Sequence, residues 1–216
     1  MGLTETVSSG RVRIKICGVT RQKDALTAAR LGADAVGLVF FAGSPRAVSV
    51  DIAREITSAL PPFVSKVGLF VNASPEEIST ILKDVTLDFL QFHGDEDPEQ
   101  CRRYSKPYIK AVKMQKSVNL NHIATYYADA AALLLDTYME GVQGGTGKTF
   151  DWTKIPADIG KPVILAGGLT AANVAGAIQQ VSPYAVDVSS GVESGKGVKD
   201  AGKMAEFIRE VRRAQK

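Results

Sequence analysis

Cysteine is scarce in this sequence. The 216 residues include only two, Cys17 and Cys101, which lie far apart and outside any CxxC pair. A disulfide framework and a structural zinc site are therefore poorly supported, and a reducing compartment fits this usage. We expect a cytoplasmic protein.

Long apolar runs and a dominant charge are also missing. Even the run Ala130–Leu135 stops at Asp136, well short of the about 20 apolar residues that a membrane helix needs. Residues 1–10 lack the basic and apolar regions of a signal peptide, and we expect them to form a disordered tail. The net charge of +3, from 26 basic and 23 acidic residues, indicates neither a nucleic-acid nor a membrane partner.

The sequence does contain a repeated strand–helix pattern, with 45% apolar and 23% charged residues as in ordinary globular proteins. No composition shift or linker divides it, so we expect a single domain over residues 11–216. The expected strands are Arg11–Ile16, Ala35–Val39, Val64–Phe70, Phe89–Phe92, Tyr108–Val112, Ala131–Leu135, Val163–Ala166 and Ala185–Val188. The expected helices are Arg21–Leu31, Asp51–Ala59, Pro75–Lys83, Pro98–Tyr104, Val118–Tyr126, Thr170–Gln180 and Asp200–Ala214, with a short one at Asp151–Ile155.

Local signals place some of the helix ends. Ser74 followed by Pro75 is typical of an N-cap and a first-turn proline. Gly32 is typical of a helix C-cap, and Thr170 is expected to cap the helix that follows it.

Regular alternation of strands and helices predicts a parallel sheet. Such a sheet is either an open doubly wound sheet or a closed (β/α)₈ TIM barrel. Eight candidate strands favour the barrel. Val12, Ile14 and Ile16 share one face of the first strand, whereas Lys15 and Cys17 share the other. A sheet with helices on both faces should not carry a lysine there. We therefore expect Lys15 and Cys17 to point into a barrel, with Cys17 at its upper rim.

Two loops are candidates for binding phosphate. Gly167-Gly168 follows the seventh strand, and Ser189-Ser190-Gly191 follows the eighth and could open a short extra helix. Barrels frequently bind phosphate with these two loops, although two ordinary glycine-containing turns would look the same. The stretch Gly144–Thr149 resembles a P-loop but has Val142 where the pattern needs glycine, so a flexible loop over a substrate (Gly141–Gly147) is favoured.

Cys17 and Asp136 are the candidate acid–base groups. Cys17 ends the first strand near Lys15, and a cation and a helix N-terminus would both favour its thiolate; a buried packing role is the alternative. Asp136 ends the apolar run of the sixth strand, where it could transfer protons or cap a turn. Arg46 in a loop could bind a carboxylate or be solvated, and His93 could be structural.

An ordered set of motifs then resembles one family. Eight segments, spread over nearly the whole chain from residue 13 onward, are similar to those of the phosphoribosylanthranilate isomerase family of tryptophan biosynthesis. They include Lys15–Thr20, Gly37–Phe41 with Ser44-Pro45-Arg46, Val67–Asn72, Leu90–Glu96, Leu135-Asp136, Gly145–Trp152, Leu165–Leu169 and Asp187–Glu193.

The resemblance implies a (β/α)₈ barrel that performs an Amadori rearrangement of N-(5-phosphoribosyl)anthranilate without cofactor or metal. By motif, Asp136 is the general acid on the furanose oxygen and Cys17 the general base at C2′. Arg46 would bind the anthranilate carboxylate and Asp187 would lie beside the sugar. The phosphate would be held at Gly168, Ser189, Ser190 and Gly191.

Other functions remain open at this point. An epimerase, an indole-forming synthase or a histidine-pathway isomerase would share the phosphate loops, and a phosphosugar sensor without catalysis would keep them. The absence of paired histidines disfavours the metal-dependent epimerase, and Cys17 disfavours the isomerase that uses two carboxylates. Monomer and homodimer are both compatible with the sequence.

Overall fold

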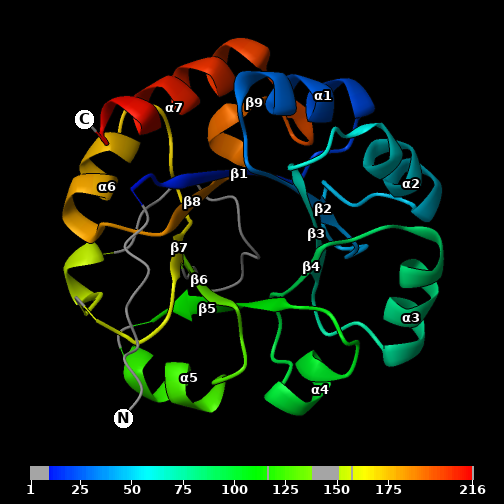
Figure 1. The fold of residues 1–216 in the computed structure, drawn as a ribbon, viewed down its shortest axis with the longest axis horizontal. Helices are drawn as coiled ribbons and strands as arrows, with labels where there is room; N and C mark the ends of the chain where they lie inside the picture. Colours follow the sequence, from blue (N-terminus) through cyan, green and yellow to red (C-terminus); the bar gives the residue numbers. More distant parts are fainter. Residues whose placement is uncertain (1–9, 116, 138–150, 157, 216) are drawn as a thin grey trace.

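Eight parallel strands form a closed barrel at the centre of the molecule (Figure 1). The structure, a computed structural model, describes residues 10–115, 117–137, 151–156 and 158–215. Each strand pairs with the next in the sequence, and β1 also pairs with β8, which closes the barrel. The strands are β1 (Arg13–Cys17), β2 (Ala35–Val39), β3 (Ser65–Phe70), β4 (Phe89–Phe92), β5 (Tyr108–Met114), β6 (Ala132–Thr137), β7 (Val163–Leu165) and β8 (Ala185–Val188).

Helices surround this barrel (Figure 1). They are α1 (Gln22–Leu31), α2 (Val50–Ala59), α3 (Pro75–Asp84), α4 (Pro98–Arg102), α5 (Leu120–Tyr126), α6 (Val174–Val181) and α7 (Ala201–Arg213). Two single 3₁₀ turns, η1 (Trp152–Lys154) and η2 (Ser190–Val192), confirm the two short helices expected there. A small antiparallel hairpin of β9 (Glu193–Gly195) and β10 (Val198–Lys199) follows η2 and was not predicted.

The two faces of β1 pack as the alternation of its residues predicts. Ile14 and Ile16 belong to the apolar layer between the barrel and the helices, together with Phe207 of α7. Cys17 instead packs with Val39, inside a separate cluster at one end of the barrel. The single-barrel prediction is therefore confirmed, and the thiol faces inward.

Most helix ends follow the local signals. Ser74 forms a capping box with Glu77, and Gly32 ends α1 with φ of 95°. The prediction for Thr170 is wrong, because α6 begins only at Val174. Thr170 donates its backbone N–H to the Asn173 side chain, which in turn donates to the Gly168 carbonyl at 2.9 Å. Residues 170–173 thus brace the loop after β7 instead of extending the helix.

Two predictions fall outside the described residues: the tail over residues 1–9, and the loop Gly141–Gly147 with the P-loop-like stretch Gly144–Thr149. In the part of the chain that the structure describes, no helix combines the length and apolar character needed to cross a membrane. Both cysteines are free and buried.

Candidate active site

The candidate base lies on strand β1 and the candidate acid on strand β6. Cys17 is the last residue of β1, as predicted, and is 5% exposed. Asp136 was expected to end its strand, and it lies one residue before the end of β6, opposite Lys113 of β5. The strand runs to Thr137 because its pairing with β5 continues to Met114. The Asp136 side chain is 14% exposed.

A buried ion pair lies directly beneath the thiol. Lys15 Nζ is 2.9 Å from Asp187 Oδ1, and the two residues are paired in register across β1 and β8. Both side chains are less than a tenth exposed, so the Coulombic attraction is weakly screened. Asp187, predicted to lie beside the sugar, is therefore neutralised by a lysine that also approaches Cys17.

The electrostatic expectation for Cys17 is confirmed for the cation, because Lys15 lowers the pKa of the thiol, but the expected net lowering of the pKa is wrong. Burial raises the pKa of the thiol above its ordinary value, and the charge of Asp187 raises it further. Lys15 and Lys199 lower the pKa but do not offset these two effects. The helix that was expected to help begins at Gln22, five positions on. The cation near the thiol was predictable, whereas the carboxylate that opposes it comes from the far end of the chain.

Asp136 is held by a chain of hydrogen bonds. Its Oδ2 is 3.2 Å from His93 Nε2, and His93 Nδ1 is 3.1 Å from Gln91 Nε2. Because the Gln91 amide donates to Nδ1, His93 carries its proton on Nε2 and donates it to Asp136. The backbone N–H of Thr137 donates to the other oxygen at 2.8 Å. His93, left as a structural residue by the sequence, therefore orients the candidate acid.

The two glycine-rich loops meet, as a shared phosphate site requires. Gly167 and Gly168 have φ of 81° and 65°, a region that favours glycine. A Cβ on Gly191 would lie 2.0 Å from the Leu169 carbonyl oxygen, so only glycine lets the loop after β8 approach the loop after β7. Ser190 and Gly191 lie in η2, directly after Ser189. The predicted phosphate residues thus lie on adjoining loops.

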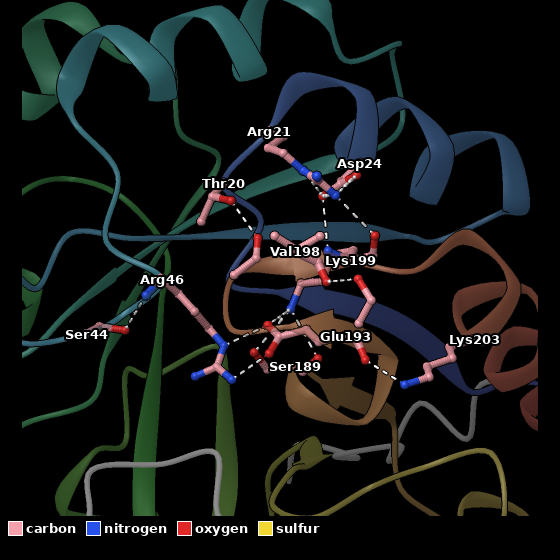
Figure 2. Close-up of polar contacts among 12 residues, drawn as sticks. Thr20, Arg21, Asp24, Ser44, Arg46, Ser189, Glu193, Val198, Lys199 and Lys203 are labelled. Carbon is pink, nitrogen blue, oxygen red and sulfur yellow. Dashed lines mark hydrogen bonds and ion pairs between the residues drawn. The ribbon is translucent and has the colours of Figure 1, made fainter.

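Arg46 lies at the same mouth but is already paired. Its Nε and Nη2 donate to the two oxygens of Glu193 at 2.8 and 2.7 Å (Figure 2). Its side chain crosses Gly18, where a Cβ would be 2.4 Å from Arg46 Cδ and 3.0 Å from Ser189 Oγ. Arg46 is thereby directed toward the loop after β8, near Cys17. Neither interpretation of Arg46 from the sequence, solvated or bound to a ligand carboxylate, included the Glu193 carboxylate that orients it.

Sequence reasoning also missed Lys199. Its Nζ donates to Glu193 at 2.7 Å and to the Ser189 carbonyl at 3.1 Å (Figure 2). Burial lowers the pKa of Lys199, although Glu193 opposes the change. The alternation of charged and small residues in 193–199 could have indicated a hairpin, but not which groups it pairs. Among the described residues, no group of three His, Cys, Asp or Glu side chains is arranged to hold a metal ion.

A closed eight-stranded barrel that gathers a thiol, a carboxyl group and buried ion pairs at the carboxyl ends of its strands defines a (β/α)₈ barrel enzyme. Residues 14–210 match the family model described as N-(5'phosphoribosyl)anthranilate (PRA) isomerase. The chain belongs to this family.

Individual relatives agree with this assignment. The N-(5'-phosphoribosyl)anthranilate isomerase of Pseudomonas aeruginosa (strain UCBPP-PA14) is 60% identical over 201 residues, covering 93% of this chain and 95% of that protein. The phosphoribosylanthranilate isomerase structure from Thermotoga maritima is 43% identical with a TM-score of 0.86, covering 93% and 98%. Another such isomerase, in complex with reduced 1-(o-carboxyphenylamino)-1-deoxyribulose 5-phosphate, is 41% identical with a TM-score of 0.83, again covering 93% and 98%.

Proposed function

We propose that this chain isomerises N-(5-phospho-β-D-ribosyl)anthranilate to 1-(2-carboxyphenylamino)-1-deoxy-D-ribulose 5-phosphate, an Amadori rearrangement in tryptophan biosynthesis. Membership of the isomerase family supports this reaction. The observation that carries it is the joint placement of Cys17 and Asp136 at the barrel mouth, beside two adjoining glycine loops. The reaction needs one acid and one base on different atoms of a sugar, and these residues come from different strands.

Asp136 is the general acid in this proposal. It donates a proton to the furanose ring oxygen, the C1′–O bond breaks, and the ring opens to a protonated Schiff base. The hydrogen bond from His93 and the backbone N–H of Thr137 hold the carboxyl group in one orientation. Proton transfer depends on such positioning, because donor and acceptor must lie within hydrogen-bond distance.

Cys17 is the general base. It removes the C2′ proton as a thiolate, and the C2′–H electrons form the enolamine, which tautomerises to the ketone. Lys15 and Lys199 favour the thiolate, while burial and Asp187 favour the thiol. Because Asp187 carries the opposite charge to Lys15, it offsets part of the stabilisation that Lys15 gives the thiolate. The apolar contacts of Cys17 with Val39 exclude water on its other side.

Substrate binding uses both ends of the molecule. Arg46 binds the anthranilate carboxylate, and backbone and hydroxyl groups of the two loops bind the phosphate, with Asp187 beside the sugar. Fixing both ends of the substrate orients it for the reaction, which lowers the activation barrier by on the order of several kcal/mol. The phosphate-binding residues are Gly168, Ser189, Ser190 and Gly191.

The setting of the protein is a further part of the proposal. We propose a cytoplasmic enzyme over residues 11–216 that acts on a small molecule, as a monomer or a homodimer. Phe63, between α2 and β3, is fully exposed at the surface. Sedimentation velocity would distinguish the two oligomeric states, and a mass above that of a dimer would contradict both.

One assay tests the reaction. Purified protein is added to phosphoribosylanthranilate, whose anthranilate fluorescence is lost on isomerisation, in buffer containing a chelator. We expect turnover that follows protein concentration. The Cys17→Ser variant, prepared in the same way, excludes a contaminating isomerase. Unchanged fluorescence with the unmodified chain would reject the proposed function.

A further inference from the structure

One buried carboxylate lies between two cations at the edge of the candidate site. Glu193 receives Arg46 Nε at 2.8 Å and Nη2 at 2.7 Å, and Lys199 Nζ at 2.7 Å (Figure 2). The Glu193 side chain is 5% exposed and that of Lys199 is fully buried. Hydrogen bonds to charged groups at such distances are among the strong ones in proteins.

The pairing determines which edge of Arg46 remains for a ligand. Glu193 occupies the edge formed by Nε and Nη2. Among the described residues, none accepts a hydrogen bond from Nη1, so the edge formed by Nη1 and Nη2 is left for a second carboxylate. Gly18 lets the Arg46 side chain lie flat across the loop after β1, and this fixes the direction of that edge.

The same carboxylate is linked to the loop after β8. Lys199 Nζ donates to Glu193 and also to the carbonyl and the hydroxyl oxygen of Ser189, at 3.1 and 3.3 Å. Thr20 donates to the Gly197 carbonyl, which fastens the hairpin of β9 and β10 to the loop between β1 and α1. Lys199 is therefore held by Glu193 and by the fastened hairpin, and it contacts Ser189 in the candidate phosphate-binding turn.

We infer that Glu193 is a positioning residue that couples the two ends of the substrate site: it orients Arg46 toward the ligand carboxylate and, through Lys199, holds Ser189 in the phosphate-binding turn. This inference rests on the proposed function, because it uses the ligand ends assigned there. It adds a residue that touches neither ligand end but determines the geometry of both.

Charge and hydrogen-bond direction support this role. Burial raises the pKa of Glu193, yet the hydrogen bonds from Arg46 and Lys199 outweigh it and hold the pKa below the ordinary value. The group is thus an anion that accepts from three donors. A glutamine in its place would present an amide donor to at least one of these cations, so the arrangement cannot be kept without the charge.

The test uses two probes and isothermal titration calorimetry. Reduced 1-(o-carboxyphenylamino)-1-deoxyribulose 5-phosphate carries both the carboxylate and the phosphate, whereas ribose 5-phosphate carries only the phosphate. We expect Glu193→Gln to weaken the binding of both probes about tenfold or more, in line with the loss of charged hydrogen bonds. Arg46→Ala should weaken mainly the binding of the first probe. Glu193→Asp should recover part of the affinity for both.

Asp24→Asn is the matched control. Asp24 is a buried carboxylate that pairs with Arg21 and accepts the backbone N–H of Lys199, so its loss weakens the same hairpin without touching Arg46 or Ser189. We expect near-normal affinity for both probes in this variant. In turnover, Glu193→Gln should raise KM about tenfold while kcat changes less than about threefold, because Glu193 contacts neither Cys17 nor Asp136.

Three outcomes would overturn the inference. Glu193→Gln could bind both probes normally, it could lose affinity for only one of them, or Asp24→Asn could weaken binding equally. If Glu193→Gln does not fold, unchanged affinity of Glu193→Asp for both probes has the same consequence. Absence of isomerase activity in the unmodified chain would reject the proposed function alone, since binding of the two probes still reports the coupling.

Discussion

At the scale of single residues, the sulfur of Cys17 carries the strongest prediction. Cys17→Ser keeps the size of the side chain but removes an ionisable thiol, so we expect turnover to fall on the order of 10²-fold or more. The steady-state fluorescence assay measures it. Cys101→Ser is the matched control, because Cys101 is also buried and free but packs outside the barrel mouth. Equal losses in the two variants would contradict the assignment of the base.

A second prediction concerns the carboxyl group of Asp136. Asp136→Asn removes the transferable proton but leaves an acceptor for the Thr137 N–H, so kcat should fall on the order of 10²-fold with the fold intact. Turnover and a thermal melt would be measured together. Asp129→Asn, which removes an exposed partner of Tyr108, is the control for losing a carboxylate. An unchanged kcat in Asp136→Asn would exclude the role of general acid.

The residue scale also shows where sequence reasoning stops. The inward direction of Cys17 follows from the alternation along β1, which depends only on neighbouring residues. The rise of its pKa depends on Asp187, which lies 170 positions later, and the pairing of Arg46 depends on Glu193. Such long-range partners are set by barrel closure and hairpin formation, and no local pattern encodes them.

At the scale of elements, the close approach of two loops gives a third prediction. Gly191→Ala would place a methyl group 2.0 Å from the Leu169 carbonyl oxygen, so the loop after β8 must move away from the loop after β7. We expect affinity for ribose 5-phosphate, measured by calorimetry, to fall about tenfold. Gly195→Ala is the control, because a Cβ there meets nothing within 4 Å. Normal phosphate affinity in Gly191→Ala would argue against a shared cradle.

Elements were predictable where local signals set them. All eight strands and the capping box at Ser74 agree with the sequence, because alternation and capping act within a few residues. The start of α6 was not, since Thr170 is used by a turn that braces the loop after β7. The hairpin of β9 and β10 was missed as well: its two short strands are held by hydrogen bonds with Asp24 of α1 and Lys203 of α7.

At the scale of the whole molecule, the eight strands close into one barrel. These strands were visible in the sequence, and one inward lysine in β1 favoured a barrel over an open sheet. Closure through β1 and β8 then brings Lys15 to Asp187, although 172 positions separate them. The active-site charges are therefore a consequence of the global fold, and they are present only when the barrel is closed.

The stability of this barrel should fall at alkaline pH. Burial raises the pKa of Cys101 and that of Tyr127 to about 12 in the folded chain, above their ordinary values of about 8.5 and about 10. As pH rises, the unfolded chain loses these protons first, so it binds fewer protons than the folded chain and the free energy of unfolding decreases. The effect is absent below the ordinary pKa values and grows up to about pH 12. Urea unfolding between pH 8 and pH 11, in about one-unit steps, would measure it. Cys101→Ala should reduce the part of the slope that begins near pH 8.5, to which the buried Cys17 thiol also contributes, whereas an identical slope in this variant would show that Cys101 does not contribute.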